Sequence, residues 1–86
     1  MKIFYADETS WTELGNFVFV LNEVSNTLYK FEGILKEFWI ILKSHNDFYE
    51  IVPKLLAKYD VDIDTLEKDL INVVQALEDE ELLIRS

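Results

Sequence analysis

The spacing of apolar residues changes near residue 32, and this change sets the class of fold. Before it, Phe17 to Leu21 is a run of aromatic and β-branched residues, which is typical of a β-strand. After it, apolar residues recur three and four positions apart from Ile34 to Leu42, as on one face of a helix. Strands followed by helices predict an α+β fold.

The first third of the chain is predicted to form three short antiparallel strands. They are Ser10 to Leu14, Phe17 to Leu21 and Thr27 to Phe31, separated by the turn signals Gly15-Asn16 and Ser25-Asn26. Both faces of the middle segment are apolar, so we expect it to be the central strand. Lys2 to Tyr5 is a further candidate for strand pairing.

Two helices are predicted next, at about Gly33 to Ser44 and Asp47 to Tyr59. Asp47 with Glu50 three residues later resembles a capping box. Pro53 removes a backbone donor, so the second helix is expected either to kink or to begin its regular part near that residue.

A third helix is predicted from an N-cap at Asp62 to about Asp79. Its most continuous apolar stripe, expected in the core, is Leu66, Leu70, Val74 and Leu77. Leu82 to Ile84 is expected to fold back as an apolar tail. The predicted architecture is a single domain over residues 1–86, winged-helix-like, with a three-stranded antiparallel sheet followed by three helices.

Composition narrows the function. The 86 residues carry a net charge of −9, lack cysteine and include one histidine, His45. Disulfides, thiolate metal sites and multi-histidine metal sites are therefore excluded. The acidic balance argues against nucleic acid and anionic membranes; it is read either as a means of solubility or as a bias toward a basic or neutral partner. An early Asp7 and the short apolar run Phe38 to Leu42 argue against a signal peptide and a membrane span, so we expect a cytoplasmic protein.

No constellation of residues indicates catalysis, a metal site or a cofactor. The acidic run Glu78 to Glu81 lacks the alternating ligands and glycine of a calcium loop, and is interpreted as a solvated helix end. The alternating Asp60, Asp62 and Asp64 are better explained by helix capping. The residue count leaves room for paired-carboxylate catalysis, but nothing singles out a pair, so an enzyme is the least supported reading.

Residues 10–84 resemble the PqqD-like family, also called recognition elements for ribosomally made, post-translationally modified peptides (RiPPs). The positions that carry this likeness are Leu21-Asn22 before a turn, Phe38-Trp39, Tyr59-Asp60, Asp69 and Leu82-Leu83. The chain departs from the family pattern at Phe31-Glu32, where Leu-Asn is usual. It departs again at Leu35 and Glu81, where glycine is usual.

The resemblance implies a non-catalytic peptide chaperone of the stand-alone kind. Such proteins bind the leader segment of a precursor peptide as an extra strand on their third β-strand, in a groove beside the third helix. They deliver the precursor to a modifying enzyme such as a radical SAM enzyme, a protease or a cyclase.

Carried onto this chain, the resemblance places the peptide site on two elements. From the third strand come Leu28, Tyr29, Lys30 and Phe31, and from the third helix come Asp69, Asn72, Val73 and Ala76. Leu28 and Lys30 share one strand face and Tyr29 and Phe31 the other, but alternation does not decide which pair faces the groove.

Two other readings remain open. A winged-helix DNA-binding regulator would need basic residues on the third helix, which carries only Lys68. Another small acidic interaction module, such as a carrier protein, would need a serine at a helix start, a setting that Ser25 and Ser44 lack. An exposed strand can also pair with itself, so either a monomer or a weak homodimer is expected.

Overall fold

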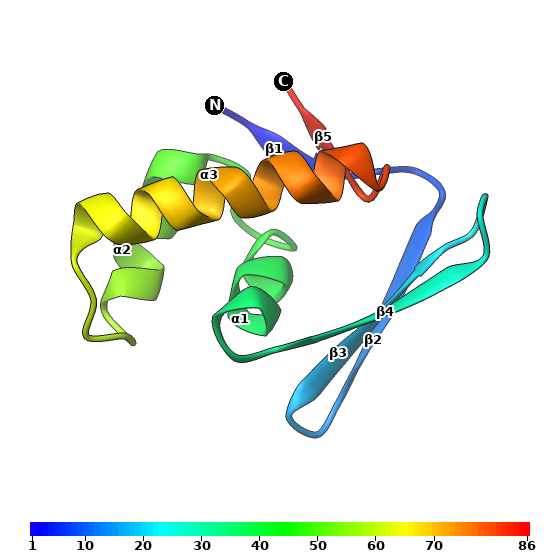
Figure 1. The fold of residues 1–86 in the computed structure, drawn as a ribbon, viewed down its shortest axis with the longest axis horizontal. Coiled ribbons are helices and arrows are strands. Elements are labelled where there is room, and N and C mark those ends of the chain that lie inside the picture. The colour runs from blue at the N-terminus through cyan, green and yellow to red at the C-terminus, as the bar shows by residue number, and fades with distance from the viewer.

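A computed structural model describes all residues from 1 to 86, and it has the predicted α+β architecture (Figure 1). The elements in chain order are β1 (Ile3–Tyr5), β2 (Thr9–Leu14), β3 (Phe17–Asn22), β4 (Thr27–Glu32), α1 (Gly33–Ile41), α2 (Phe48–Leu56), α3 (Ile63–Asp79) and β5 (Leu83–Arg85). The expected three-stranded antiparallel sheet followed by three helices is confirmed.

The main sheet has the order β2-β3-β4, so the predicted central strand is central. Its two turns use the predicted residues, with Gly15 at φ +61° and Asn26 at φ 61°. Both values lie in the left-handed region, which glycine and asparagine tolerate better than other residues. Register is continuous: Val20 lies opposite Trp11 on β2 and opposite Tyr29 on β4.

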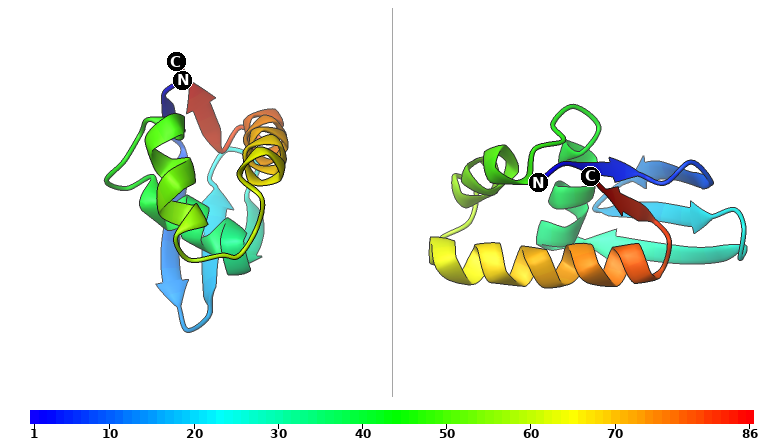
Figure 2. Two further views of the ribbon diagram at one scale, coloured as in Figure 1. Left: turned by 90° about the vertical axis from the view of Figure 1, so that its left-hand side faces the viewer. Right: turned by 90° about the horizontal axis from the view of Figure 1, so that it is seen from above.

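The two ends of the chain pair with each other. β1 runs antiparallel to β5, with Tyr5 opposite Leu83, and forms a separate two-stranded sheet. The Ser86 N–H donates to the Lys2 carbonyl at 2.9 Å. The termini therefore lie side by side (Figure 2), and the apolar tail is folded back as expected.

A single apolar core joins one face of the main sheet to the helices. Val18, Val20 and Phe31 point into it from the sheet, and Trp39 of α1 is fully buried between Phe31 and Tyr5. Burial raises the pKa of the Tyr5 hydroxyl. The predicted stripe of α3 is also buried, as Leu66, Leu70, Val74 and Leu77.

The first two helices are shorter than predicted. α1 ends at Ile41 because the chain turns there, and the Ile41 carbonyl accepts from the N–H groups of Ser44 and His45. α2 begins at Phe48, so the alternative start near Pro53 is wrong. Asp47 caps it by accepting from the Tyr49 N–H at 3.0 Å.

The C-terminus of α3 closes with a Schellman motif. The Leu82 N–H donates to the Leu77 carbonyl at 2.9 Å, and the Glu81 N–H donates to the Glu78 carbonyl at 2.9 Å. This geometry requires a left-handed residue, and Glu81 has φ 61°. The position where the family usually has glycine is thus one that favours glycine for a steric reason.

None of the helices has the length and apolar character needed to cross a membrane.

Candidate functional site

One edge of the main sheet, strand β4, has no partner on its outer side. β4 pairs only with β3, and no other backbone hydrogen bond in the structure uses a residue between Thr27 and Phe31. An unpaired edge presents a row of free N–H and C=O groups, which is what an incoming extended peptide needs.

The hydrogen-bond pattern shows which backbone groups of β4 are free. The Glu23 N–H donates to the Glu8 carbonyl at 2.8 Å, so the odd-numbered residues of β3 face β2 and the even-numbered ones face β4. Val20 lies opposite Tyr29, so Tyr29 directs its N–H and C=O to β3. The N–H and C=O groups of Leu28 and Lys30 therefore point outward.

Burial decides the orientation that alternation left open. Tyr29 and Phe31 turn toward the core, with Tyr29 half-buried and Phe31 5% exposed. Leu28 and Lys30 lie on the opposite, outer face of the sheet, where Leu28 is 64% exposed. The Lys30 ammonium lies 4.1 Å from the centre of the Phe17 ring on that face.

A hydrogen bond links β4 to the end of α3. The Tyr29 hydroxyl donates to the Glu80 carboxylate at 2.6 Å. This bond raises the pKa of Tyr29, with smaller contributions from desolvation and from the nearby negative charge of Glu80. β4 and α3, which are distant in sequence, are thereby held together at one end.

The same bond identifies the side of α3 that faces the strand. Residues about one, two and three turns before Glu80 share its face, and these are Ala76, Val73 and Asp69. Val73 is half-buried and the other two are exposed. Asn72 lies to the solvent side of this row, where it borders a shallow hollow with Asp64, Glu67, Lys68 and Ile71. Three of the four helix residues suggested by the resemblance thus share the helix face of Glu80, the residue that bonds to β4.

Asn22 reinforces the link between the hairpin and α3. Its side chain is nearly buried, and its oxygen accepts from the N–H groups of Val24 and Ser25 at 3.0 and 3.2 Å. Its amide nitrogen donates to the Glu80 carbonyl at 3.0 Å. One side chain therefore both shapes the turn before β4 and holds the end of α3.

Sequence reasoning missed the roles of Asn22 and Glu80. The available signals were the Leu-Asn pair before the turn and the acidic run, which was interpreted as a solvated helix end. The run does lie at an exposed helix end, and the structure adds two contacts there: Glu80 bonds to Tyr29, and Glu78 forms an ion pair with Arg85 at 2.6 Å. No group of three residues is placed to hold a metal ion.

No hollow in the structure is bounded by both β4 and α3. The site is an open strand edge beside a helix face rather than an enclosed cavity. Such an arrangement offers backbone hydrogen bonds and a flanking apolar and acidic surface, which suits binding of an extended chain.

Two solved structures resemble this fold closely. "TbiB1 in Complex with the TbiA(beta) Leader Peptide" matches with a TM-score of 0.91 and 26% identity, over 96% of each chain. "Lasso peptide synthetase B1 complexed with the leader peptide" matches with a TM-score of 0.85 and 15% identity, over 99% of this chain and 100% of that one; it shows likeness of fold alone. No curated protein sequence matches significantly.

Family comparison agrees with the fold. The PqqD family, described as coenzyme PQQ synthesis protein D, matches residues 18–83, a segment that includes nearly all of β3, then β4, all three helices and the start of β5. The resemblance noted in the sequence is therefore confirmed, and the chain belongs to the PqqD family.

Proposed function

We propose that this protein binds the leader segment of a ribosomally made precursor peptide as an added strand on β4. The observation that carries the proposal is the free edge at Leu28 and Lys30, next to a helix face that is tied to the same strand by the Tyr29–Glu80 bond. The similar solved structure of TbiB1, at 26% identity, is a complex with a leader peptide, which supports the same role here.

The geometry assigns different tasks to the backbone and the side chains. Outward N–H and C=O groups of Leu28 and Lys30 would supply affinity that depends little on the leader sequence. Leader side chains on the inner face would meet Tyr29, Val73 and Ala76, with Phe31 behind them. Those on the outer face would lie beside the side chains of Leu28 and Lys30.

Acidic positions on α3 would add selectivity. Asp69 is exposed on the row that faces β4, with Asn72 at its margin, so a basic leader residue there would be favoured over an acidic one. Exposed ion pairs contribute only about 0–1 kcal/mol. We therefore assign Asp69 a part in choosing the peptide rather than in holding it.

The role is one of binding and delivery, without catalysis. A bound leader would bring the remainder of its precursor to a separate modifying enzyme, such as a radical SAM enzyme, a protease or a cyclase. No group of three or more metal-ligating side chains accompanies the site, and the net charge of −9 does not suit nucleic acid.

Titration with leader peptides encoded beside this gene tests the proposal. We expect a dissociation constant on the order of 10⁻⁸ to 10⁻⁵ M by calorimetry. In amide NMR spectra, the N–H signals of Leu28 and Lys30 should shift, together with those of Val73 and Ala76. A leader that binds without moving the β4 signals would disprove strand addition.

A further inference from the structure

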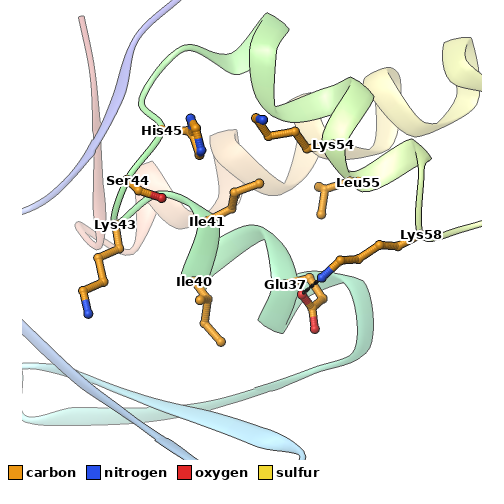
Figure 3. Close-up of a pocket in the computed structure, with 9 residues that line it drawn as sticks. All are labelled: Glu37, Ile40, Ile41, Lys43, Ser44, His45, Lys54, Leu55 and Lys58. Atoms are coloured by element: carbon orange, nitrogen blue, oxygen red, sulfur yellow. Dashed lines mark hydrogen bonds and ion pairs between the residues drawn. The ribbon is translucent and has the colours of Figure 1, made fainter.

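A cavity of about 420 Å³ lies between α1, α2 and the loop that joins them (Figure 3). Its lining residues are Glu37, Ile40, Ile41, Lys43, Ser44, His45, Lys54, Leu55 and Lys58. None of them belongs to β4 or α3, so this cavity is separate from the edge proposed for the leader.

The charge of this cavity is opposite to that of the molecule. Its lining has three lysines and one glutamate, a net of +2 on a chain whose net charge is −9. The other two hollows differ: one has Asp64, Glu67 and Lys68, a net of −1, and one on the outer face of the sheet has no charged residue. Positive charge is therefore concentrated at one hollow of an acidic protein.

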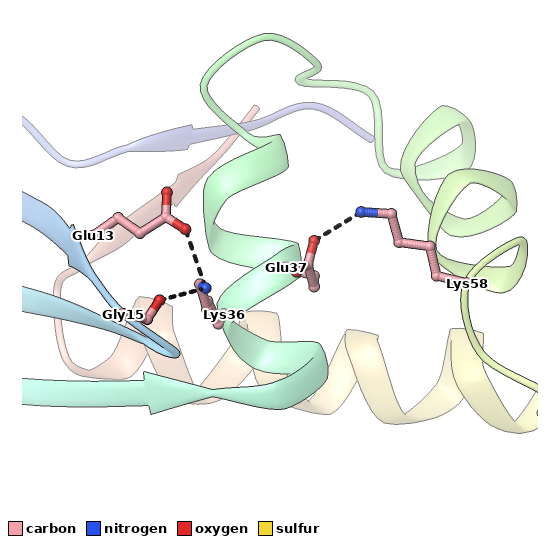
Figure 4. A network of polar contacts seen from close by, with 5 residues as sticks. All are labelled: Glu13, Gly15, Lys36, Glu37 and Lys58. Carbon is pink, nitrogen blue, oxygen red and sulfur yellow. Dashed lines mark hydrogen bonds and ion pairs between the residues drawn. The ribbon is translucent and has the colours of Figure 1, made fainter.

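Much of this positive charge has no partner within the protein. Lys58, in the turn after α2, pairs with Glu37 of α1 at 3.0 Å across one side of the cavity (Figure 4). Lys43 and Lys54 form no ion pair, and the side chains of Ser44 and His45 form no hydrogen bond. In Figure 3, Lys54 extends toward His45, whereas Lys43 lies at the rim.

The floor of the cavity is apolar. Ile40 and Ile41 of α1 are half-buried, and Leu55 of α2 is 2% exposed. A simple anion would be attracted by the lysines but would gain nothing from these aliphatic side chains. A group that joins a carboxylate to an apolar side chain would use both parts of the cavity.

We infer that this cavity docks an acidic segment of the modifying enzyme, through a carboxylate followed by an apolar side chain. This inference rests on the proposed function, which requires a second contact surface because the leader occupies β4. The negative charge elsewhere on the protein repels an acidic segment, so complementarity directs that segment to the α1–α2 cavity.

Amide NMR on the full chain tests this chemistry with two matched probes. One is an acetylated, amidated short peptide that contains an Asp-Leu pair, and the other has Asn-Leu in its place. We expect the Asp-Leu probe to shift the signals of Ile41, His45 and Leu55 in a saturable way, and the Asn-Leu probe to shift them little. Equal binding of the two probes, or shifts spread outside the cavity, would overturn the inference.

Two variants and a small anion sharpen the result. Lys54→Gln should lower the affinity for the Asp-Leu probe about fivefold, which is the effect of one charge contact. Lys68→Gln on α3 removes the same charge from the protein and should leave the affinity for the probe unchanged. Equal effects of both variants would show only general charge attraction. Acetate that binds at these residues as tightly as the peptide would show that the apolar floor contributes nothing, and would also refute the docking of a segment.

The leader titration separates this inference from the proposed function. If a leader shifts the amide signals of Leu28 and Lys30 and the Asp-Leu probe shifts no signal, only the docking inference is refuted. If the probe binds in the cavity and no leader perturbs β4, strand addition fails and the chemistry of the cavity stands. Lys54→Gln should retain the leader affinity of the unmodified chain.

Discussion

The two edges of the main sheet provide similar backbone groups but differ in their surroundings. β2 and β4 are both edge strands, each paired only with β3. Seen from above in Figure 2, β4 lies on the α3 side of the sheet and β2 on the opposite side. β4 is tied to α3 through Tyr29, whereas β2 is tied to α1 through Lys36, which contacts Glu13 and the Gly15 carbonyl at 3.1 Å each (Figure 4).

This difference indicates that free backbone alone does not make a peptide site. Unpaired N–H and C=O groups occur along both edges, and they would accept almost any extended chain. Only β4 has a helix row beside it, formed by Asp69, Val73 and Ala76, that can contact the side chains of a guest strand. Selectivity is therefore expected at β4 and not at β2.

The largest expected effects come from proline at neighbouring positions of β4. Tyr29→Pro removes a donor that faces β3 and should lower the free energy of unfolding by about 3 kcal/mol. Lys30→Pro removes a donor that faces outward. It should leave most of the stability intact and lower the affinity for the leader about tenfold or more. Urea unfolding and calorimetry measure the two quantities.

The opposite edge supplies the control for that experiment. Glu13→Pro on β2 removes an outward donor together with the ion pair to Lys36, and Glu13→Gln removes the ion pair alone. Neither should change leader affinity. Loss of leader binding in Glu13→Pro but not in Glu13→Gln would place the peptide on β2 and reverse the comparison.

Asn22→Ala should produce the next largest effect, because it breaks the connection between the β4 hairpin and α3. The substitution leaves two turn N–H groups and the Glu80 carbonyl without this partner. We expect a loss of about 2 kcal/mol in the free energy of unfolding, measured in urea, and a lower affinity for the leader peptide. Asn26→Gly, in the same turn but away from α3, is the matched control and should keep both properties.

Glu81→Gly should stabilise the protein by about 1 kcal/mol, because glycine adopts the left-handed conformation without steric cost. Glu81 lies at the end of α3, the helix beside β4. A more favourable helix end should not lower the affinity for the leader. Thermal unfolding and calorimetry would check both points. A lower melting temperature would mean that the Glu81 side chain contributes more than its backbone conformation costs.

The smallest effect is expected from the Tyr29–Glu80 bond itself. The pKa of Tyr29 is raised in the folded protein. The bond therefore contributes fully to stability below the ordinary tyrosine pKa of about 10, and its contribution is lost as pH rises through the pKa of the folded state. Spectroscopic titration should show one tyrosine that ionises at lower pH in Glu80→Gln than in the unmodified chain. An unchanged titration would indicate that the bond does not persist in solution.

Much of the fold was predictable because local patterns determine it. A run of aromatic and β-branched residues located β3, and the 3,4-spacing with the Asp62 cap located α3 within a residue of its observed start. The β1–β5 pair was harder to foresee, since three-residue strands carry little periodicity and their partners lie at opposite ends of the chain. Helix ends at Ile41 and Leu56 depend on turns that spacing does not reveal.

The candidate site was less accessible to sequence reasoning. Leu28, Tyr29 and Phe31 are all apolar, so alternation did not show which side of β4 faces the core; packing on Trp39 decides it. The contribution of Glu80 depends on where α3 ends relative to β4, which is a tertiary property. The positive charge of the α1–α2 cavity was likewise not evident from the sequence, because Lys43 lies in the turn after α1 and Lys54 lies in α2.

The pairing of β1 with β5 gives the molecule ends that meet. Lys2 and Ser86 exchange backbone hydrogen bonds, so a short connector would join the two termini with little rearrangement. A circular permutant opened at the Gly15-Asn16 turn would keep β4, α3 and the α1–α2 cavity intact. For the same reason, the whole unit is suited to insertion within a surface loop of a larger enzyme, which it would enter and leave at nearly the same point.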